Sequence, residues 1–196
     1  MDSPHSASFV DNEETGIPDS GSATSKPRAA YPEIVCSSVP SADKLEEYRR
    51  RVADTNIDSR SLLSTDYFNT FNSVVMVLDM LPDSPELLEE IEQWRFVDYI
   101  QHFKSSGLDF AELAIEVYPF SPPELREAFE RKADGIRIVI EELPHTLRRL
   151  LNAGEKGAFS DICRTMATQL RLLMEEGNSI VHGNQASTQA DIDKLF

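Results

Sequence analysis

The longest regular apolar pattern in this chain is SPPELREAFERKADGIRIVIEELPHTLRRL, residues 121–150. It begins with Ser121 at an N-cap position, proline in the first turn, and Glu124 where a capping box places its acid. The run 136–140 is rich in β-branched residues, but helix formers flank it without a turn signal, which favours a helix over a strand. Pro144 predicts a kink or break late in this helix. The apolar positions that follow the helical period are Leu125, Phe129, Ile136, Ile140, Leu143, Leu147 and Leu150.

Helical signals continue on both sides of this stretch. Ser41 opens a highly charged capped segment, and Ser84 is an N-cap followed by proline at the first helical position. Stop signals are Pro82, Gly107 and Gly177. The other predicted helices span 41–50, 66–80, 84–94, 96–103 and 160–176. Because strand signals are scarce, we predict an all-α fold of five to seven helices, arranged as an irregular or up-down bundle.

The composition changes near both ends of the helical region. Residues 1–40 are rich in Ser, Ala, Pro, Gly and acid and have no periodic apolar face, so we expect them to be disordered. Residues 183–187 are typical of a short polar linker. We therefore divide the chain into a disordered acidic tail, a helical domain over 41–182, this linker, and a C-terminal docking peptide over 188–196.

The net charge of −15 limits the classes of partner. A chain this acidic repels phosphate backbones and anionic lipids, so we expect neither nucleic-acid binding nor binding to a membrane surface, and the apolar pattern argues against membrane insertion. No apolar run approaches the roughly 20 residues that a spanning helix needs, and residues 1–10 lack the regions of a signal peptide. Cys36 and Cys163 suggest no disulfide framework, which fits a reducing compartment. We predict a soluble cytoplasmic protein.

No motif for metal, nucleotide or cofactor chemistry is found in the sequence. The four histidines share no metal-ligand spacing with one another or with either cysteine, so we expect no metal and no cofactor. His102, close in sequence to Phe103, is more typical of a surface or core histidine than of a ligand. Aromatic residues at helical spacing indicate core packing. They are Tyr67, Phe68, Phe71, Trp94, Phe96, Tyr99 and Phe103.

Residues 188–196 have the features of a short helix without a surface to pack on. Thr188 is a good N-cap, and Asp191 follows three residues later, as in a capping box. Ile192, Leu195 and Phe196 fall at i, i+3 and i+4 and share one face. Because so short a helix is marginal alone, we expect it to fold when it docks into a partner's groove. The alternative is a frayed helix whose apolar residues cap the domain's own core.

The segment Ser187-Thr-Gln-Ala-Asp-Ile-Asp-Lys-Leu-Phe196 resembles the response-regulator-binding peptide of the flagellar switch protein FliM, roughly Leu-Ser-Gln-x-Glu/Asp-Ile-Asp-x-Leu-Leu. In that family the peptide binds the phosphorylated CheY receiver domain. It lies at the N-terminus of FliM, whereas here it lies at the end of the sequence. The resemblance covers about ten residues, so it implies a binding partner for this chain but does not indicate the fold of its helical domain. The matching positions are Gln189, Asp191, Ile192, Asp193 and Leu195, with Thr188 in place of Ser and Phe196 in place of the final aliphatic residue.

The overall layout of acidic helices, polar linker and C-terminal docking helix resembles the CheZ phosphatases, which place a catalytic acid and carboxamide on a bundle helix as Asp-x-x-x-Gln. That signature is absent here. The nearest candidates are Asp66 and Asn69, with the Asp/Glu-x-x-Asn spacing of the CheC/CheX phosphatases, and Gln169, about two turns beyond Asp161. Each also has a simpler interpretation, as a charge at a helix N-terminus or an exposed polar position.

We therefore predict a chemotaxis or flagellar-motor signalling protein that binds a CheY-type response regulator through residues 188–196. Its role toward that regulator stays open between dephosphorylation of the aspartyl phosphate, sequestration, and delivery to a site, and we favour a non-enzymatic adaptor over a phosphatase. An alternative from another class is a helical scaffold or regulatory subunit that has no receiver-domain partner and packs its tail on its own bundle. The stripe over 143–150 looks exposed in sequence and could support a homodimer.

Overall fold

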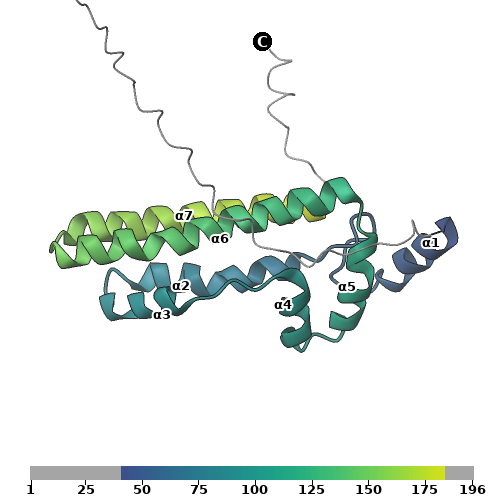
Figure 1. The fold of residues 1–196 in the computed structure, drawn as a ribbon, viewed down its shortest axis with the longest axis horizontal. Coiled ribbons are helices and arrows are strands. Elements are labelled where there is room, and N and C mark those ends of the chain that lie inside the picture. The colour runs from purple at the N-terminus through teal and green to yellow at the C-terminus, as the bar shows by residue number, and fades with distance from the viewer. Residues whose placement is uncertain (1–40, 184–196) are drawn as a thin grey trace, which may run out of the picture.

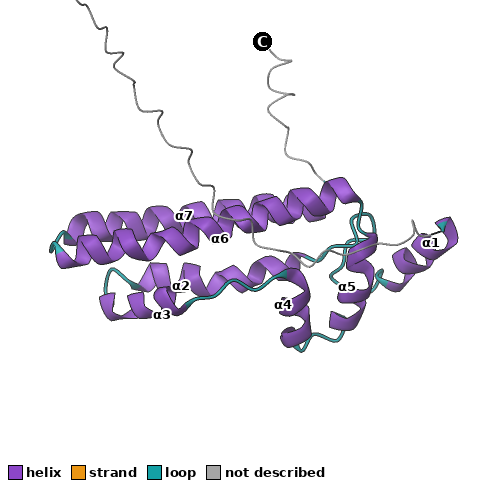
Figure 2. Ribbon diagram, viewed as in Figure 1, coloured by secondary structure: helices purple, strands orange, loops and turns teal. Residues whose placement is uncertain are grey.

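A computed structural model describes residues 41–183 of the chain. The predictions for the acidic tail, for the linker beyond Gly183 and for the docking peptide lie outside these residues. Within the described part the fold is all-α, as predicted, and contains no strand (Figures 1 and 2). Its elements are α1 Ala42–Arg51, η1 Thr65–Phe71, α2 Asn72–Met80, η2 Pro85–Leu87, α3 Leu88–Gln93, α4 Tyr99–Ser106, α5 Ala111–Val117, η3 Tyr118–Phe120, α6 Pro123–Asn152 and α7 Lys156–Val181, where η denotes a 3₁₀ helix.

Two long helices and two short ones form the body of the bundle. Helices α6 and α7 make an antiparallel hairpin, and α2 and α3 lie along its lower side in Figure 1. Helix α2 packs against α7, while α3 packs against α6, so the four helices contact one another in a ring. Helices α4 and α5 pack together at one end of this body, and α1 lies farther out at the same end. None of the helices in residues 41–183 is long and apolar enough to cross a membrane.

Two of the predicted helix caps are confirmed. The Ser41 hydroxyl accepts the N–H of Lys44, which satisfies one of the free donors in the first turn of α1. Gly107 ends α4 with φ +67°, a left-handed conformation that glycine adopts without a steric penalty. Asp98 is the N-cap of α4, so this helix begins at Tyr99 and not at Phe96 as predicted, and an extended segment precedes it.

Four other predicted helix starts need correction, and one of them is that of α7, which begins at Lys156 and not at Ser160. The segment 66–80 begins as the 3₁₀ helix η1 and becomes α-helical only at Asn72. Ser84 precedes η2 but makes no side-chain capping bond. Helix α6 starts at Pro123 with Pro122 at the cap position, so Ser121 does not cap it. Proline in the first turn has its φ fixed near the helical value, and it lacks an N–H group that would otherwise need a capping partner. This pre-organisation replaces the expected serine cap.

Two predicted breaks are absent. Helix α6 continues through Pro144 to Asn152, because proline removes one backbone hydrogen bond while its neighbours Leu143 and Leu147 hold the helix in the core. Helix α7 likewise continues through Gly177 to Val181. A Cβ at Gly177 would lie 2.3 Å from Cζ of Phe68, so this glycine permits close packing and does not end the helix.

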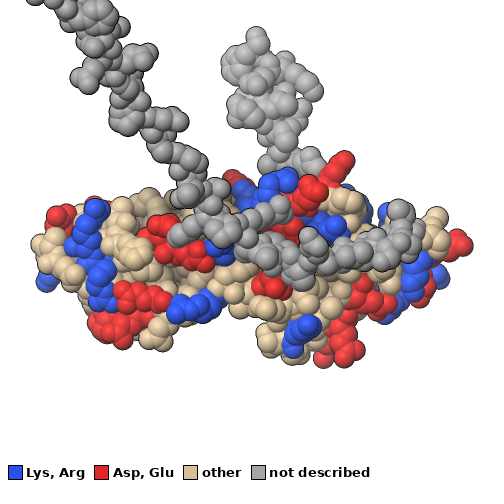
Figure 3. Space-filling view, viewed as in Figure 1, with Lys and Arg blue, Asp and Glu red and all other residues tan. Residues whose placement is uncertain are grey.

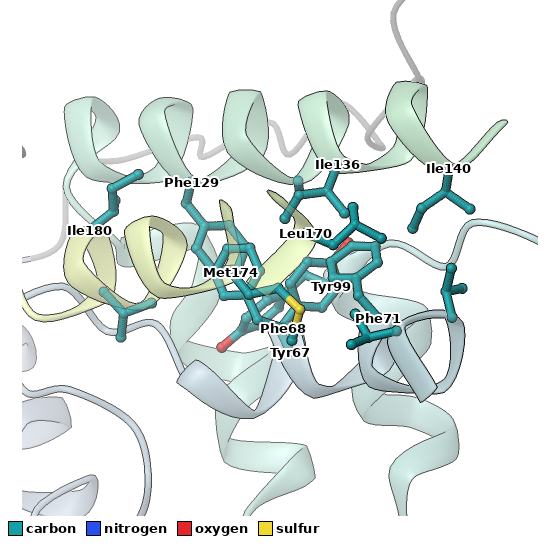
Figure 4. Packing of buried hydrophobic residues seen from close by; sticks show 14 of the residues in the cluster. Tyr67, Phe68, Phe71, Tyr99, Phe129, Ile136, Ile140, Leu170, Met174 and Ile180 are labelled. Atoms are coloured by element: carbon teal, nitrogen blue, oxygen red, sulfur yellow. The ribbon is translucent and has the colours of Figure 1, made fainter. Parts of the chain in front are cut away.

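The aromatic cluster forms the centre of the core, as predicted. Figure 4 shows rings from η1, α4 and α6 that meet beneath α7. The Phe68 and Phe129 centroids are 5.0 Å apart, and Tyr99 stacks on Tyr118 at 4.4 Å. Trp94 and Phe96 are half-buried at the edge of this cluster. The largest fully buried aromatic side chains are Tyr67, Phe68, Phe71, Tyr99, Phe103, Tyr118 and Phe129.

The stripe over 143–150 is not the exposed surface that its sequence suggested. Leu143 and Leu147 are buried in the chain's own core, and Leu150 is half-buried against it. The stripe therefore stabilises the monomeric bundle and offers no apolar face for a homodimer. A homodimer remains a prediction without this surface to support it.

Candidate functional site

The predicted acid Asp66 lies at the start of η1 and is held by three side chains. Its Oδ2 accepts hydrogen bonds from Asn56 Nδ2 at 2.9 Å and from the Ser64 hydroxyl at 3.3 Å. Its Oδ1 accepts from Asn69 Nδ2 at 3.2 Å. The Asp66 N–H in turn donates to Ser64 Oγ, which caps the 3₁₀ helix. This carboxylate thus closes the loop before η1 onto the helix's first turn.

The predicted carboxamide, Asn69, is exposed but engaged at both of its polar atoms. Its Nδ2 donates to Asp66, and its Oδ1 accepts from Asn72 Nδ2 at 3.2 Å. To orient a water molecule on a partner's phosphate, Asn69 would first have to give up these local bonds. The arrangement favours a structural role over a catalytic one.

Gln169 is exposed on α7 and lies far from this pair. Phe68 of η1 contacts Gly177, and Gln169 precedes Gly177 by eight residues, about 12 Å along the helix axis. Asp161, the nearest acid before it in the predicted pattern, pairs with Arg164 at 2.8 Å. The structure therefore does not bring Gln169 together with Asp66 and Asn69.

Behind η1, His102 is a half-buried core histidine, but its Nε2 is buried without a hydrogen-bond partner in the part of the chain that the structure describes, so it is not the satisfied histidine that we expected. Its ring packs edge-on against Tyr67 and Phe103, at centroid distances of 5.7 and 4.9 Å. Burial lowers the pKa of His102 below its ordinary value, and the charge of Asp66 opposes this shift only in part. Residues 41–183 hold no group of three His, Cys, Asp or Glu side chains that could bind a metal ion.

Sequence reasoning missed how the end of α7 is anchored. A guanidinium nitrogen of Arg60 donates to the carbonyl of His182, and the His182 ring lies 3.4 Å from Asp58. Gly183 then turns the chain with φ +68°. Burial alone would raise the pKa of Asp58, but the N–H groups of Ser61 and Arg60 and the His182 ring lower it below its ordinary value. The point at which the chain leaves the bundle is therefore fixed.

A second surface also escaped sequence reasoning. Met76 and Met80 project from the outer side of α2, and a small groove lies between α2 and α3 beside them. Helix α2 reads NSVVMVLDM, and this mostly apolar sequence does not distinguish the exposed Met76 and Met80 from their buried neighbours. It shares no residue with the predicted catalytic positions.

Comparisons with known proteins return no match to a family model, a curated protein or a solved structure. The functional proposals below therefore depend on this chain's own residues and on the motif resemblance in its C-terminal peptide.

Proposed function

We propose that this protein is a chemotaxis or flagellar-motor signalling protein that binds a CheY-type response regulator through residues 188–196. The observation that carries this proposal is the match of that peptide to the FliM pattern. The binding residues are Gln189, Asp191, Ile192, Asp193, Leu195 and Phe196.

The anchoring of α7 supports a docking peptide that is separate from the bundle. Arg60 holds the carbonyl of His182, and Gly183 then turns the chain with φ +68°. The peptide over 188–196 therefore follows a fixed helix end and is not a continuation of α7.

The geometry of the predicted catalytic residues favours an adaptor over a phosphatase. Dephosphorylation of a receiver domain needs a carboxamide that is free to orient water, with a nearby acid. Asn69 and Asp66 are hydrogen-bonded to each other. Gln169 lies about two turns of α7 away from Gly177, the residue next to Phe68 of η1. We therefore propose that the protein binds its regulator in the cytoplasm without enzymatic turnover.

The test is a binding titration of the full chain and of a variant that ends at residue 187. Each is titrated with a CheY-type receiver domain, with and without beryllium fluoride as the acyl-phosphate mimic. We expect the full chain to bind the activated receiver and the truncated chain to lose binding, with the same thermal midpoint for both. Equal binding by the two forms, or no binding by either, would contradict the proposal.

A further inference from the structure

The outer face of α2 carries an exposed pair of methionines. Ser73, Met76, Val77 and Met80 follow one another at helical spacing and share this face. Met76 is 62% exposed and Met80 50%, so two of the four large exposed hydrophobic side chains of the described part lie on one short helix. Methionine side chains are flexible and polarizable, and they adapt to different apolar partners. Such a pair is more typical of a contact surface than of an ordinary solvated face.

A groove of about 60 Å³ runs between this face and α3. The buried side chains of Val74 and Ile91 form its floor, and Val77 and Trp94 are among its walls. Small-molecule sites occupy roughly 300–1,000 Å³, so this groove is too small for a cofactor or a metabolite. Its size fits a single aliphatic side chain of another protein.

The groove lies in a strongly acidic segment. Residues 72–95 contain one basic residue, Arg95, and six acids. Two of the acids are neutralised from other helices: Asp79 pairs with Arg171, and Glu92 pairs with Arg148 at 2.7 Å. Figure 3 shows acidic side chains gathered over α3. The other four, which form no ion pair with the described residues, are Asp83, Glu86, Glu89 and Glu90.

We infer that the α2–α3 face, defined by Ser73, Met76, Val77, Met80, Glu90 and Trp94, binds a basic amphipathic helix of a partner protein. One apolar side chain of that helix enters the groove, and its neighbours at i+3 and i+4 lie on Met76 and Met80. Lysine or arginine side chains on its flanks pair with the carboxylates that form no ion pair within the described part of the chain. The recognition combines an apolar anchor with a complementary charged rim.

Charge argues against a second copy of this chain as the occupant. Two α2–α3 faces brought together would place the same carboxylates opposite one another, and like charges across an interface oppose association. A basic helix instead neutralises them. This inference is independent of the C-terminal peptide and of its proposed regulator.

Trp94 makes the binding directly measurable. It is the only tryptophan in the chain, and it lines the groove. The probe is a synthetic leucine–lysine peptide of about five helical turns, with leucine at i, i+3, i+4 and i+7. A peptide of the same composition, scrambled so that the leucines do not share a face, is the control. We expect a saturable change in Trp94 emission with the amphipathic peptide and at least roughly tenfold weaker binding of the scrambled one.

Two substitutions test whether the proposed face is the site. Met80→Lys and Glu90→Lys should each weaken binding roughly tenfold, because one removes an apolar contact and both add a repelling charge. Leu172→Lys and Glu175→Lys on α7 are matched controls, since Leu172 is 55% exposed and Glu175 is also exposed. These controls should bind like the wild type, and circular dichroism should show that all four variants fold.

Three results would overturn the inference. Equal binding of the two peptides would show attraction by net charge alone. Equal losses in the α2–α3 and α7 variants, or no loss in either, would place the contact elsewhere. A wild-type dimer that Met80→Lys converts to a monomer in sedimentation would make a second copy the occupant. A chain that ends at residue 187 should bind the peptide unchanged, which separates this test from that of the proposed regulator.

Discussion

Replacing Gly177 with alanine should destabilise the bundle, although alanine is the better helix former. Gly177 lies inside α7, where alanine would gain about 1 kcal/mol in helix propensity. Its added Cβ would lie 2.3 Å from Cζ of Phe68 and 2.6 Å from two further ring atoms. The ring cannot move away freely, because Phe68 is buried and Phe129 packs against it at 5.0 Å.

Overpacking of this kind costs about 1–3 kcal/mol, and a contact this short belongs at the upper end of that range. After the propensity gain, we expect Gly177→Ala to lower the free energy of unfolding by about 2 kcal/mol. For a domain of this size that corresponds to a fall of roughly 6 °C in the thermal midpoint. Urea titration followed by circular dichroism gives the free energy directly.

Gly135→Ala is the matched control, because Gly135 lies inside α6 and a Cβ there would meet nothing within 4 Å. It should raise the free energy of unfolding by about 0.5–1 kcal/mol through propensity alone. Phe68→Leu should lessen the cost of Gly177→Ala in the double variant, since it removes the clashing ring atoms. An unchanged or raised stability for Gly177→Ala would refute the packing explanation and show that the Phe68 ring moves aside at little cost.

Further perturbations test other parts of the bundle. Burial raises the pKa of the Cys163 thiol to about 11, so a disulfide reagent at pH 8 should modify it only when urea unfolds the chain, and prompt reaction in the native state would be contrary evidence. The lowered pKa of Asp58 contributes stability that is present above its unfolded value of about 4 and is lost as the pH falls through the folded pKa, so Asp58→Asn should destabilise at pH 7 and have little effect near pH 2. Asp98→Ala removes the α4 cap, whose carboxylate accepts the N–H of Gln101, and should cost about 1 kcal/mol in urea unfolding.

The sequence supported the helical class because its local signals agree with the fold. Ser41 and Gly107 satisfy backbone groups of their own helices, and such local bonds are readable from nearby residues. Helix α5 was missed because Phe110 at its cap position makes no side-chain bond and only seven residues follow. The break predicted at Pro144 and the helix end predicted at Gly177 were wrong for a different reason. Their effect is decided by buried neighbours from distant segments, and local rules carry no information on those neighbours.

The candidate site shows the same division between local and distant information. The spacing of Asp66 and Asn69 was visible in the sequence, but their mutual hydrogen bond and the contribution of Asn56 depend on a loop folding back onto η1. Likewise, nothing in the sequence places Arg60 beside His182, because the two residues are 122 positions apart. The acidic run over 86–92 is visible in the sequence, whereas the groove between α2 and α3 required the packed structure.

The two proposed contacts are compatible with an adaptor because they share no residue. Arg171, which pairs with Asp79 on α2, precedes Gly183 by twelve residues, about 18 Å along α7. A regulator held by residues 188–196 and a basic helix held by the α2–α3 face use no residue in common. If both bind, the bundle holds them at a short distance from each other, and this raises their effective concentration toward one another without any direct affinity between them. A rigid helical body with its exit fixed by Arg60 is suited to that function, since neither proposed contact requires the core to rearrange.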